Sequence, residues 1–182
     1  MLLRNMMILL VMMVAGTVHA SQGDKRLDGL FVQLRTSPNA GEAKLVENRI
    51  ETIWGYNEQT EINHLMHQGI VAIRWHNFPV AHQIFDRVVQ QAPHFAEAWN
   101  MRAITEYVMG NYQAALQDTL QTLALEPRHF RALFRLGSIF VKMGRHEEAL
   151  EAYRTVMVIH PHLEGLDAKF ARVKKAVNAS RI

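Results

Sequence analysis

Apolar residues recur at intervals of three and four over three stretches of this chain, 27–35, 42–56 and 164–178, with polar residues between them. This spacing puts the apolar side chains on one face of an α-helix and predicts an amphipathic helix in each stretch. Between the first two stretches, Pro38 breaks the pattern, and Ser37 or Asn39 is expected to cap the second helix. The apolar positions are Leu27, Leu30, Phe31 and Leu34; Val46, Ile50, Ile53 and Trp54; and Leu163, Leu166, Phe170, Val173 and Val177.

The part of the chain between these stretches repeats itself. Pro93, Pro127 and Pro161 fall 34 positions apart, and a period of this length is typical of stacked helix pairs. Small residues keep the same step, as two antiparallel helices require where they cross. Proline cannot continue a helix and so ends each pair, while Gly110 and Gly144 stand where the turn between helices needs a left-handed residue. The small residues are Gly69, Ala103 and Gly137, and then Ala81, Ala115 and Ala149.

The repeating unit resembles the tetratricopeptide repeat (TPR). Residues 96–129 and 130–163 match its signature well, whereas residues 62–95 form a weaker copy with Gln68 in place of Leu and His76 in place of Gly. The signature positions are Trp99, Ala103, Gly110, Tyr112, Ala115 and Pro127 in one copy, and Leu133, Leu136, Gly137, Phe140, Gly144, Ala149, Tyr153 and Pro161 in the next.

The resemblance implies an all-α fold, a short right-handed α-solenoid of three TPR helix pairs at 62–95, 96–129 and 130–163. Residues 21–61 are predicted to form a polar tail and a divergent N-terminal helix pair, which we expect to pack on the first repeat. Residues 164–182 are predicted to form a C-terminal capping helix and tail. Lys169, Arg172, Lys174 and Lys175 lie on the polar side of this helix, which favours a solvated cap over a lipid-binding helix.

Residues 1–20 have the pattern of a secretory signal peptide. Arg4 precedes an apolar run from Met6 to Gly16, and small residues at Val18 and Ala20 predict cleavage after Ala20. The run is shorter than the roughly 20 residues that span a bilayer, so we expect no stable membrane insertion after cleavage. The leader and the helix pair after it resemble small exported TPR proteins of Gram-negative bacteria. That resemblance implies a periplasmic location and no established biochemical activity.

Composition and motifs indicate a binding protein rather than an enzyme. The formal net charge is only +3 and the basic residues form no long run, which argues against nucleic-acid binding. The chain has no cysteine, and it lacks a phosphate-binding loop, a nucleophile elbow and a dinucleotide-binding glycine pattern. We therefore predict no catalytic residues and no cofactor.

The resemblance to the TPR family places the partner site in the concave groove lined by the first helix of each repeat. This surface mixes apolar and basic residues and suits a peptide or protein partner with an acidic or terminal carboxylate group. Phe134 and Ser138 stand where the family's chaperone-tail binders need Lys and Asn, so that ligand is not predicted. The implied groove residues are Asn63, Met66, Ile70, Arg74, Glu97, Asn100, Ile104, Tyr107, Arg131, Phe134, Ser138 and Lys142.

The chain has ten histidines, which raise a second hypothesis. His64 and His67 are three residues apart on one predicted helix and suggest a periplasmic metal-binding protein as the alternative function. Structural or surface roles are the simpler interpretation of the others. His160 and His162 flank Pro161 and are expected to face solvent, and His82 is expected to be a half-buried packing residue. The partner's identity and the oligomeric state are left open.

Overall fold

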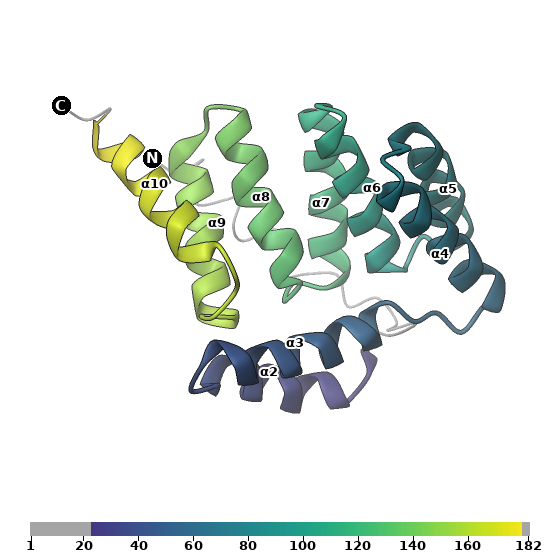
Figure 1. Ribbon diagram of the computed structural model, residues 1–182, viewed down its shortest axis with the longest axis horizontal. Helices are drawn as coiled ribbons and strands as arrows, with labels where there is room; N and C mark the ends of the chain where they lie inside the picture. Colours follow the sequence, from purple (N-terminus) through teal and green to yellow (C-terminus); the bar gives the residue numbers. More distant parts are fainter. Residues whose placement is uncertain (1–22, 180–182) are drawn as a thin grey trace.

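A computed structural model describes residues 23–179, and in that range the chain forms α-helices and no strands (Figure 1). The predicted leader, its cleavage point and the last three residues lie outside the described residues. Within 23–179, none of the helices is both long and apolar enough to cross a membrane. The helices are α2 (Arg26–Thr36), α3 (Ala40–Trp54), α4 (Thr60–Arg74), α5 (Phe78–Gln91), α6 (Ala96–Val108), α7 (Tyr112–Leu125), α8 (Phe130–Lys142), α9 (His146–Ile159) and α10 (Leu166–Ala179).

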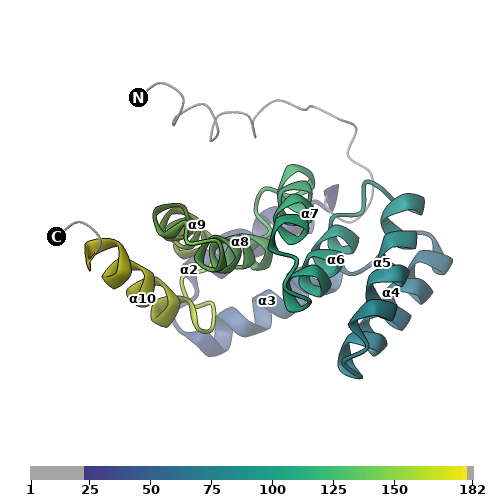
Figure 2. The ribbon, with the colours of Figure 1, turned by 90° about the horizontal axis from the view of Figure 1, so that it is seen from above.

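Helices α4 to α9 form three antiparallel pairs that stand side by side in a curved row, with α10 packed on α9 at its end (Figures 1 and 2). The pairs are α4 with α5, α6 with α7, and α8 with α9, in agreement with the three expected repeats. The all-α solenoid predicted from the sequence is therefore confirmed. Leu166, Val173 and Val177 of α10 are buried, whereas Lys169, Arg172, Lys174 and Lys175 are exposed.

Small residues allow the two helices of a pair to come close together. A Cβ atom on Gly69 would lie 2.5 Å from the ring of Phe85, and one on Gly137 would lie 2.5 Å from the ring of Tyr153. Such distances are far below van der Waals contact, so each aromatic ring fills the space left by a missing side chain. The glycines at the 34-residue step thus have a packing reason in the first and third pairs.

The turns between paired helices contain a left-handed residue. Gly110 and Gly144 have φ angles of 84° and 74°, as their position in the repeat predicts. The first pair has His76 at this point, with a φ of 57°. Asn77 then caps α5 by accepting a hydrogen bond from the backbone N–H of Val80, and Pro79 lies in the first turn, where it disrupts no helical hydrogen bond.

The α2–α3 hairpin is not where we expected it. It does not extend the row of helices beyond the first repeat but runs across one edge of the row, beneath the loops that join successive pairs (Figure 1). Its apolar face belongs to the same core as α7 to α10, whereas α4 and α5 form a separate core with the start of α6. The hairpin residues in that shared core are Leu27, Phe31, Leu34, Ala43, Val46, Ile50 and Trp54.

The polar outer side of α4 explains why the α2–α3 hairpin does not pack on the first repeat. His64 and Gln68 are exposed there. The residue one and two repeats after His64 is a buried alanine, Ala98 and then Ala132. A polar first face cannot bury the apolar side of another helix pair without leaving the imidazole and amide groups unpaired. The prediction that the hairpin packs on the first repeat was therefore wrong, because the start of the row is already a polar cap.

Overpacking of a helix crossing should destabilise the fold. Ala115 has no exposed surface. Ala115→Leu should lower the free energy of unfolding by about 1–3 kcal/mol, because the larger side chain must displace its neighbours. The control is Ala114→Leu, since Ala114 directly precedes Ala115 on α7 and is exposed. Equal thermal midpoints for the two variants would contradict the assigned register.

Removal of the backbone strain at His76, the left-handed residue of the first repeat, should stabilise the fold. His76→Gly should raise the free energy of unfolding by roughly 1 kcal/mol, because glycine adopts a positive φ without steric cost. Urea denaturation followed by circular dichroism measures the change. His94→Gly provides a control at an exposed histidine outside these turns. A loss of stability in His76→Gly would show that the contact of its ring with Phe78 outweighs the backbone strain.

Candidate functional site

The inner side of the curved row is formed by α4, α6, α8 and α10 (Figure 2). A cleft of about 240 Å³ opens on this side where α6 and α8 meet the end of α3. This volume is below the usual 300–1,000 Å³ of small-molecule sites and suits one or two side chains of a larger partner. Its lining residues are Glu51, Trp54, Glu97, Asn100, Met101, Ile104, His129, Arg131 and Arg135.

Arg135 of α8 is the distinctive charged group of this cleft. Its Nη1 donates to the side-chain oxygen of Asn100, and no carboxylate lies within ion-pair distance of it among residues 23–179. Burial lowers the pKa of Arg135 to about 10, although the nearby charge of Glu97 partly opposes this effect. The guanidinium is thus still charged at neutral pH, partly removed from water and neutralised by no acid in contact with it.

A chain of hydrogen bonds fixes the position of Arg135. The Asn100 amide nitrogen donates to Glu97 over 3.0 Å, and His129 Nε2 lies 3.0 Å from the same Glu97 oxygen. His129 Nδ1 accepts the backbone N–H of Ala132, so Nε2 carries the proton and donates to Glu97. His129 and Asn100 are 1% and 3% exposed. This network holds the cleft in one arrangement without a bound partner.

The neighbouring Arg131 is paired with two acidic residues of the same chain. It donates to Glu47 through Nη2 and to Glu51 through Nε, both on α3. Glu47 also contacts Lys44 at 2.6 Å and His160 Nε2 at 2.9 Å. Burial alone would raise the pKa of Glu47, but hydrogen bonds from His160 and Lys44 and the charges of Arg131 and Lys44 outweigh it and lower the pKa to about 2.

Stacked rings complete the junction between the hairpin and the repeats. Trp54 of α3 stacks on His129 with ring centroids 4.2 Å apart, and Phe130 lies 5.1 Å from both Trp54 and His160. Arg128 lies over the ring of Phe31 and pairs with Asp28 of α2. One wall of the cleft is therefore built by α3, whose Trp54 is buried in the core beneath it.

The structure brings four of the expected groove residues to the cleft, namely Glu97, Asn100, Ile104 and Arg131. Tyr107 is half-buried one turn further along α6, while Arg74 and Lys142 are exposed near the ends of α4 and α8. The remaining residues make contacts inside the chain. Met66 and Ile70 belong to the first core, Asn63 bonds the backbone of Asn57, and Phe134 and Ser138 contact Lys169 of α10.

Arg135 was missed by the sequence reasoning. The signal was present, because Arg135 lies four residues after Arg131 and so on the same side of α8. Trp54 and Glu51 had no such signal, since they reach the cleft only because the hairpin crosses the edge of the repeats.

Two histidine expectations need correction. His160 is 1% exposed and bonded to Glu47, and His162 Nε2 lies 2.9 Å from the backbone oxygen of Ser37. His160 is therefore buried and His162 is half-buried, because both contact the hairpin. His82 is half-buried as expected and pairs with Glu106. His64 and His67 are exposed on α4, and residues 23–179 contain no group of three or more metal-ligating side chains.

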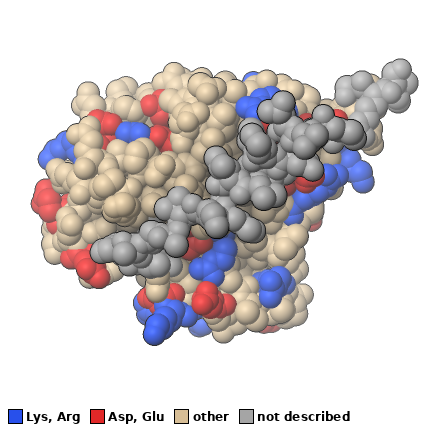
Figure 3. All heavy atoms as spheres, turned by 180° about the vertical axis from the view of Figure 1, so that it is seen from behind, with Lys and Arg blue, Asp and Glu red and all other residues tan. Residues whose placement is uncertain are grey.

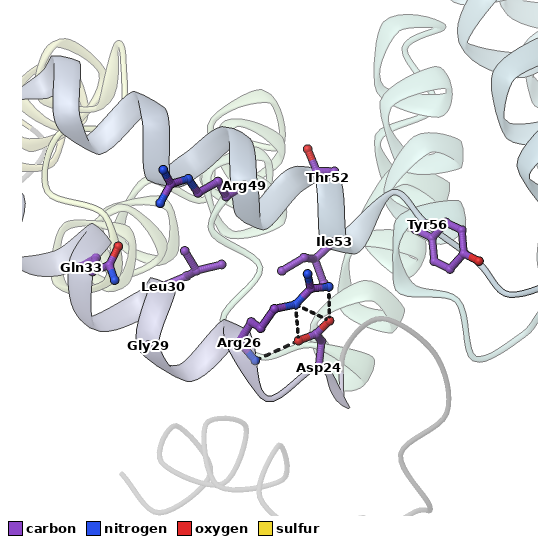
Figure 4. A pocket seen from close by; sticks show the side chains of 9 residues that line it. All are labelled: Asp24, Arg26, Gly29, Leu30, Gln33, Arg49, Thr52, Ile53 and Tyr56. Atoms are coloured by element: carbon purple, nitrogen blue, oxygen red, sulfur yellow. Dashed lines mark hydrogen bonds and ion pairs between the residues drawn. The ribbon is translucent and has the colours of Figure 1, made fainter.

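A second and larger cleft, of about 740 Å³, runs between the two helices of the hairpin (Figure 4). Leu30 and Ile53 point toward each other across it, and the ion pair of Arg26 with Asp24 closes one end. Its surface is mostly apolar and holds no unpaired buried charge. On the face seen in Figure 3, acidic and basic side chains are interspersed rather than gathered by sign.

Acidification should weaken the attachment of the hairpin through Glu47. Because its folded pKa of about 2 lies below the ordinary 4.5, Glu47 contributes stability above pH 4.5 that is lost as pH falls toward 2. Glu47→Gln should cost roughly 1–3 kcal/mol at pH 7 and should flatten this part of the curve of unfolding free energy against pH. Chemical denaturation at several pH values measures it.

The control for that series is Glu164→Gln, which neutralises an exposed acid between α9 and α10. It should follow the wild-type curve. If Glu47→Gln also ran parallel to wild type from pH 5 to pH 2, the carboxylate would not link the hairpin to the repeats in the way described here.

Comparison with known proteins identifies the family. The family model described as Tetratricopeptide repeat matches residues 68–122 and 100–162. A TPR repeat-containing protein of Rhizobium etli is 34% identical over 142 residues, which cover 78% of this chain and 70% of that protein.

Solved structures agree on the fold. The first TPR domain of Spaghetti (RPAP3), bound to the HSP90 peptide SRMEEVD, superposes with a TM-score of 0.63 at 17% identity, covering 64% of this chain and 93% of that one. The Yersinia enterocolitica type III secretion chaperone SycD, in complex with a peptide of the translocator YopD, gives 0.63 at 14% identity, covering 69% and 100%. With the 34-residue period, the curved row of helix pairs and the matched family model, this chain belongs to the tetratricopeptide repeat family.

Proposed function

We propose that this protein is an exported, non-enzymatic interaction module that binds an acidic peptide segment of a partner protein on its concave side. The observation that carries the proposal is the environment of Arg135 in the cleft between α6 and α8. Its guanidinium is partly withdrawn from water and contacts no carboxylate in the part of the chain that the structure describes, so its preference for an anion is unmet. The planar fork of arginine matches a carboxylate.

The surroundings of Arg135 supply the rest of a peptide site. Ile104 and Tyr107 present partly exposed apolar surface along α6, next to the cleft. An apolar strip beside a buried cation is the pattern expected for a peptide that combines an apolar anchor with an acidic group. Asn100 then acts through Arg135, since both of its polar atoms are used within the chain.

Relatives of the same fold support peptide binding as the general mode. The RPAP3 and SycD domains were each solved with a peptide bound, and the RPAP3 peptide contains adjacent glutamates and ends in aspartate. The proposal takes from them only the mode of recognition. It does not extend to chaperone tails, because Phe134 and Ser138 replace the residues expected for that ligand.

Export is part of the proposal and rests on the sequence of residues 1–20. A partner would then be met outside the cytoplasm, in the periplasm of a Gram-negative bacterium. The alternative metal-binding function lacks support of this kind. His64 and His67 offer two ligands, and a third would have to come from elsewhere.

Site-specific photo-crosslinking in cells tests the proposed groove. We expect p-benzoylphenylalanine in place of Tyr107 to give a crosslinked partner. The same group in place of Val158, which is 66% exposed on α9, should not give that product. Arg135→Gln should reduce the Tyr107 product at least about tenfold, because it removes a desolvated charge contact.

Arg87→Gln is the matched control, since Arg87 is exposed on α5 and its loss changes the net charge equally. It should leave the crosslink unchanged. A partner captured equally well from Val158, or a Tyr107 product that Arg135→Gln does not weaken, would place the interaction on another surface. The cleft of the hairpin would then be the next surface to probe.

A further inference from the structure

The inner side of α8 continues beyond Arg135 as a line of polar and basic residues. Arg131, Arg135, Ser138 and Lys142 follow one another at intervals of three and four residues and so lie along one side of the helix. Helix α10 adds a cation to this line, because Lys169 Nζ donates to Ser138 Oγ over 2.9 Å. The same ammonium lies 5.0 Å from the centre of the Phe134 ring.

Lys169 does not stand alone. Arg172 lies three residues further on the same side of α10, and Lys142 lies one turn beyond Ser138 on α8. Although Lys169 as a whole is exposed, partial burial of its ammonium beside Ser138 and Phe134 lowers its pKa, and the charges of Arg172 and Lys142 lower it further. We call Lys142, Lys169 and Arg172 the basic triad.

The triad differs from the other basic groups that contact the core. Arg102 is bound by Asp86 and Asp118, Arg128 by Asp28 and Glu126, and Arg131 by Glu47 and Glu51. In residues 23–179, no carboxylate lies within ion-pair distance of a triad member. Three like charges gathered without a counter-charge repel one another, and an anion from outside removes that cost.

We propose that the basic triad is a second carboxylate-binding subsite on the concave side, which receives acidic residues of the same peptide that meets Arg135. This inference rests on the proposed function. The chain itself shows the matching chemistry, because two glutamates of α3 bind Arg131 at the other end of the same line. The acidic residues of the partner would pair with the cations further along α8, as the glutamates of α3 pair with Arg131.

The spacing along α8 gives the partner a pattern. Arg135 and Lys142 are seven residues apart, which is about 10 Å along a helix axis. An extended peptide covers about 10 Å in roughly three residues. The expected ligand is therefore an extended segment with acidic groups about three residues apart and an apolar residue that reaches Ile104 or Tyr107.

A peptide explains the triad better than an anionic membrane does. A helix that lies on a bilayer inserts its apolar face among the lipids. In α10 that face is already used, because Leu166, Val173 and Val177 are buried against the rest of the fold. The triad also lies beside the concave line of α8 rather than on a separate outer surface.

Binding of a defined acidic probe tests the subsite directly. Fluorescein-labelled octaglutamate should raise its anisotropy on titration with the protein lacking residues 1–20. Changing the triad to glutamine (Lys142→Gln, Lys169→Gln, Arg172→Gln) should weaken binding by about tenfold or more. Arg172→Gln alone should weaken it severalfold, and Arg172 is exposed, so its replacement is not expected to disturb the core.

The controls separate local recognition from general charge attraction. Lys174→Gln together with Arg87→Gln and Arg35→Gln removes the same charge at exposed positions outside the groove and should leave the affinity within about twofold. Equal weakening in this control, or no binding of octaglutamate by wild type, would overturn the triad as a subsite. Circular dichroism melts confirm that each variant is folded.

Two further measurements identify the source of the anion. If phosphatidylglycerol vesicles bind the wild-type protein but not the triad variant, and octaglutamate does not bind, the triad is a lipid site and the peptide subsite is overturned. If inorganic phosphate at millimolar concentration competes as well as octaglutamate does, the triad is only a small-anion site, and the peptide subsite is overturned as well.

The crosslinking experiment separates the two proposals. If the Tyr107 crosslink persists at full yield in the triad variant, the second subsite fails while the groove proposal stands. If wild type gives no Tyr107 crosslink, the groove proposal fails and the octaglutamate result still decides the triad.

Discussion

The buried carboxylate of Glu47 joins the two parts of this protein. It contacts Arg131 from the third helix pair, His160 from the loop after that pair, and Lys44 from its own helix. A carboxylate that is 3% exposed would be costly without such partners, so the hairpin and the repeats must meet in one register for the charge to be satisfied. Trp54, stacked on His129, adds an apolar contact at the same junction.

This junction shapes the concave side. By crossing the edge of the row, α3 contributes Glu51 and Trp54 to the cleft and occupies Arg131, which would otherwise be open to a partner. Two glutamates of α3 thus occupy the Arg131 end of the groove on α8. What is left for a partner lies further along α6 and α8, where no carboxylate of the described residues, 23–179, contacts Arg135 and Tyr107 is partly exposed.

The two clefts differ in a way that matters for function. The larger one, between α2 and α3, has a mostly apolar lining with the Arg26–Asp24 ion pair at one end, and its remaining cation, Arg49, is exposed to water. The smaller one has a fixed hydrogen-bond network and a desolvated cation. Volume alone favours the larger cleft as the binding site. A charged group without a counter-ion makes binding specific, however, and this favours the smaller cleft, which contains Arg135.

The sequence by itself determined the helices, their pairing and their turns. These depend on neighbours within one 34-residue unit, so spacing shows them directly: Gly69 and Gly137 under aromatic rings, Gly110 and Gly144 at positive φ, and proline at the end of each pair. The resemblance to the TPR family implied that Glu97, Asn100, Ile104 and Arg131 line the inner side, and the structure brings these four residues to one cleft.

Only the tertiary structure decided where the hairpin packs and which groove residues remain available. Glu47 and His160 are 113 residues apart, and Arg131 and Glu47 are 84 apart, so no local pattern marks them as partners. The sequence pattern of an amphipathic helix pair shows that the pair has an apolar face, but it does not show which surface of the fold will cover that face. Here the polar start of α4 excluded one surface and the ring-lined loops of the second and third repeats provided another, and that choice buried His160, engaged Arg131 and left Arg135 open.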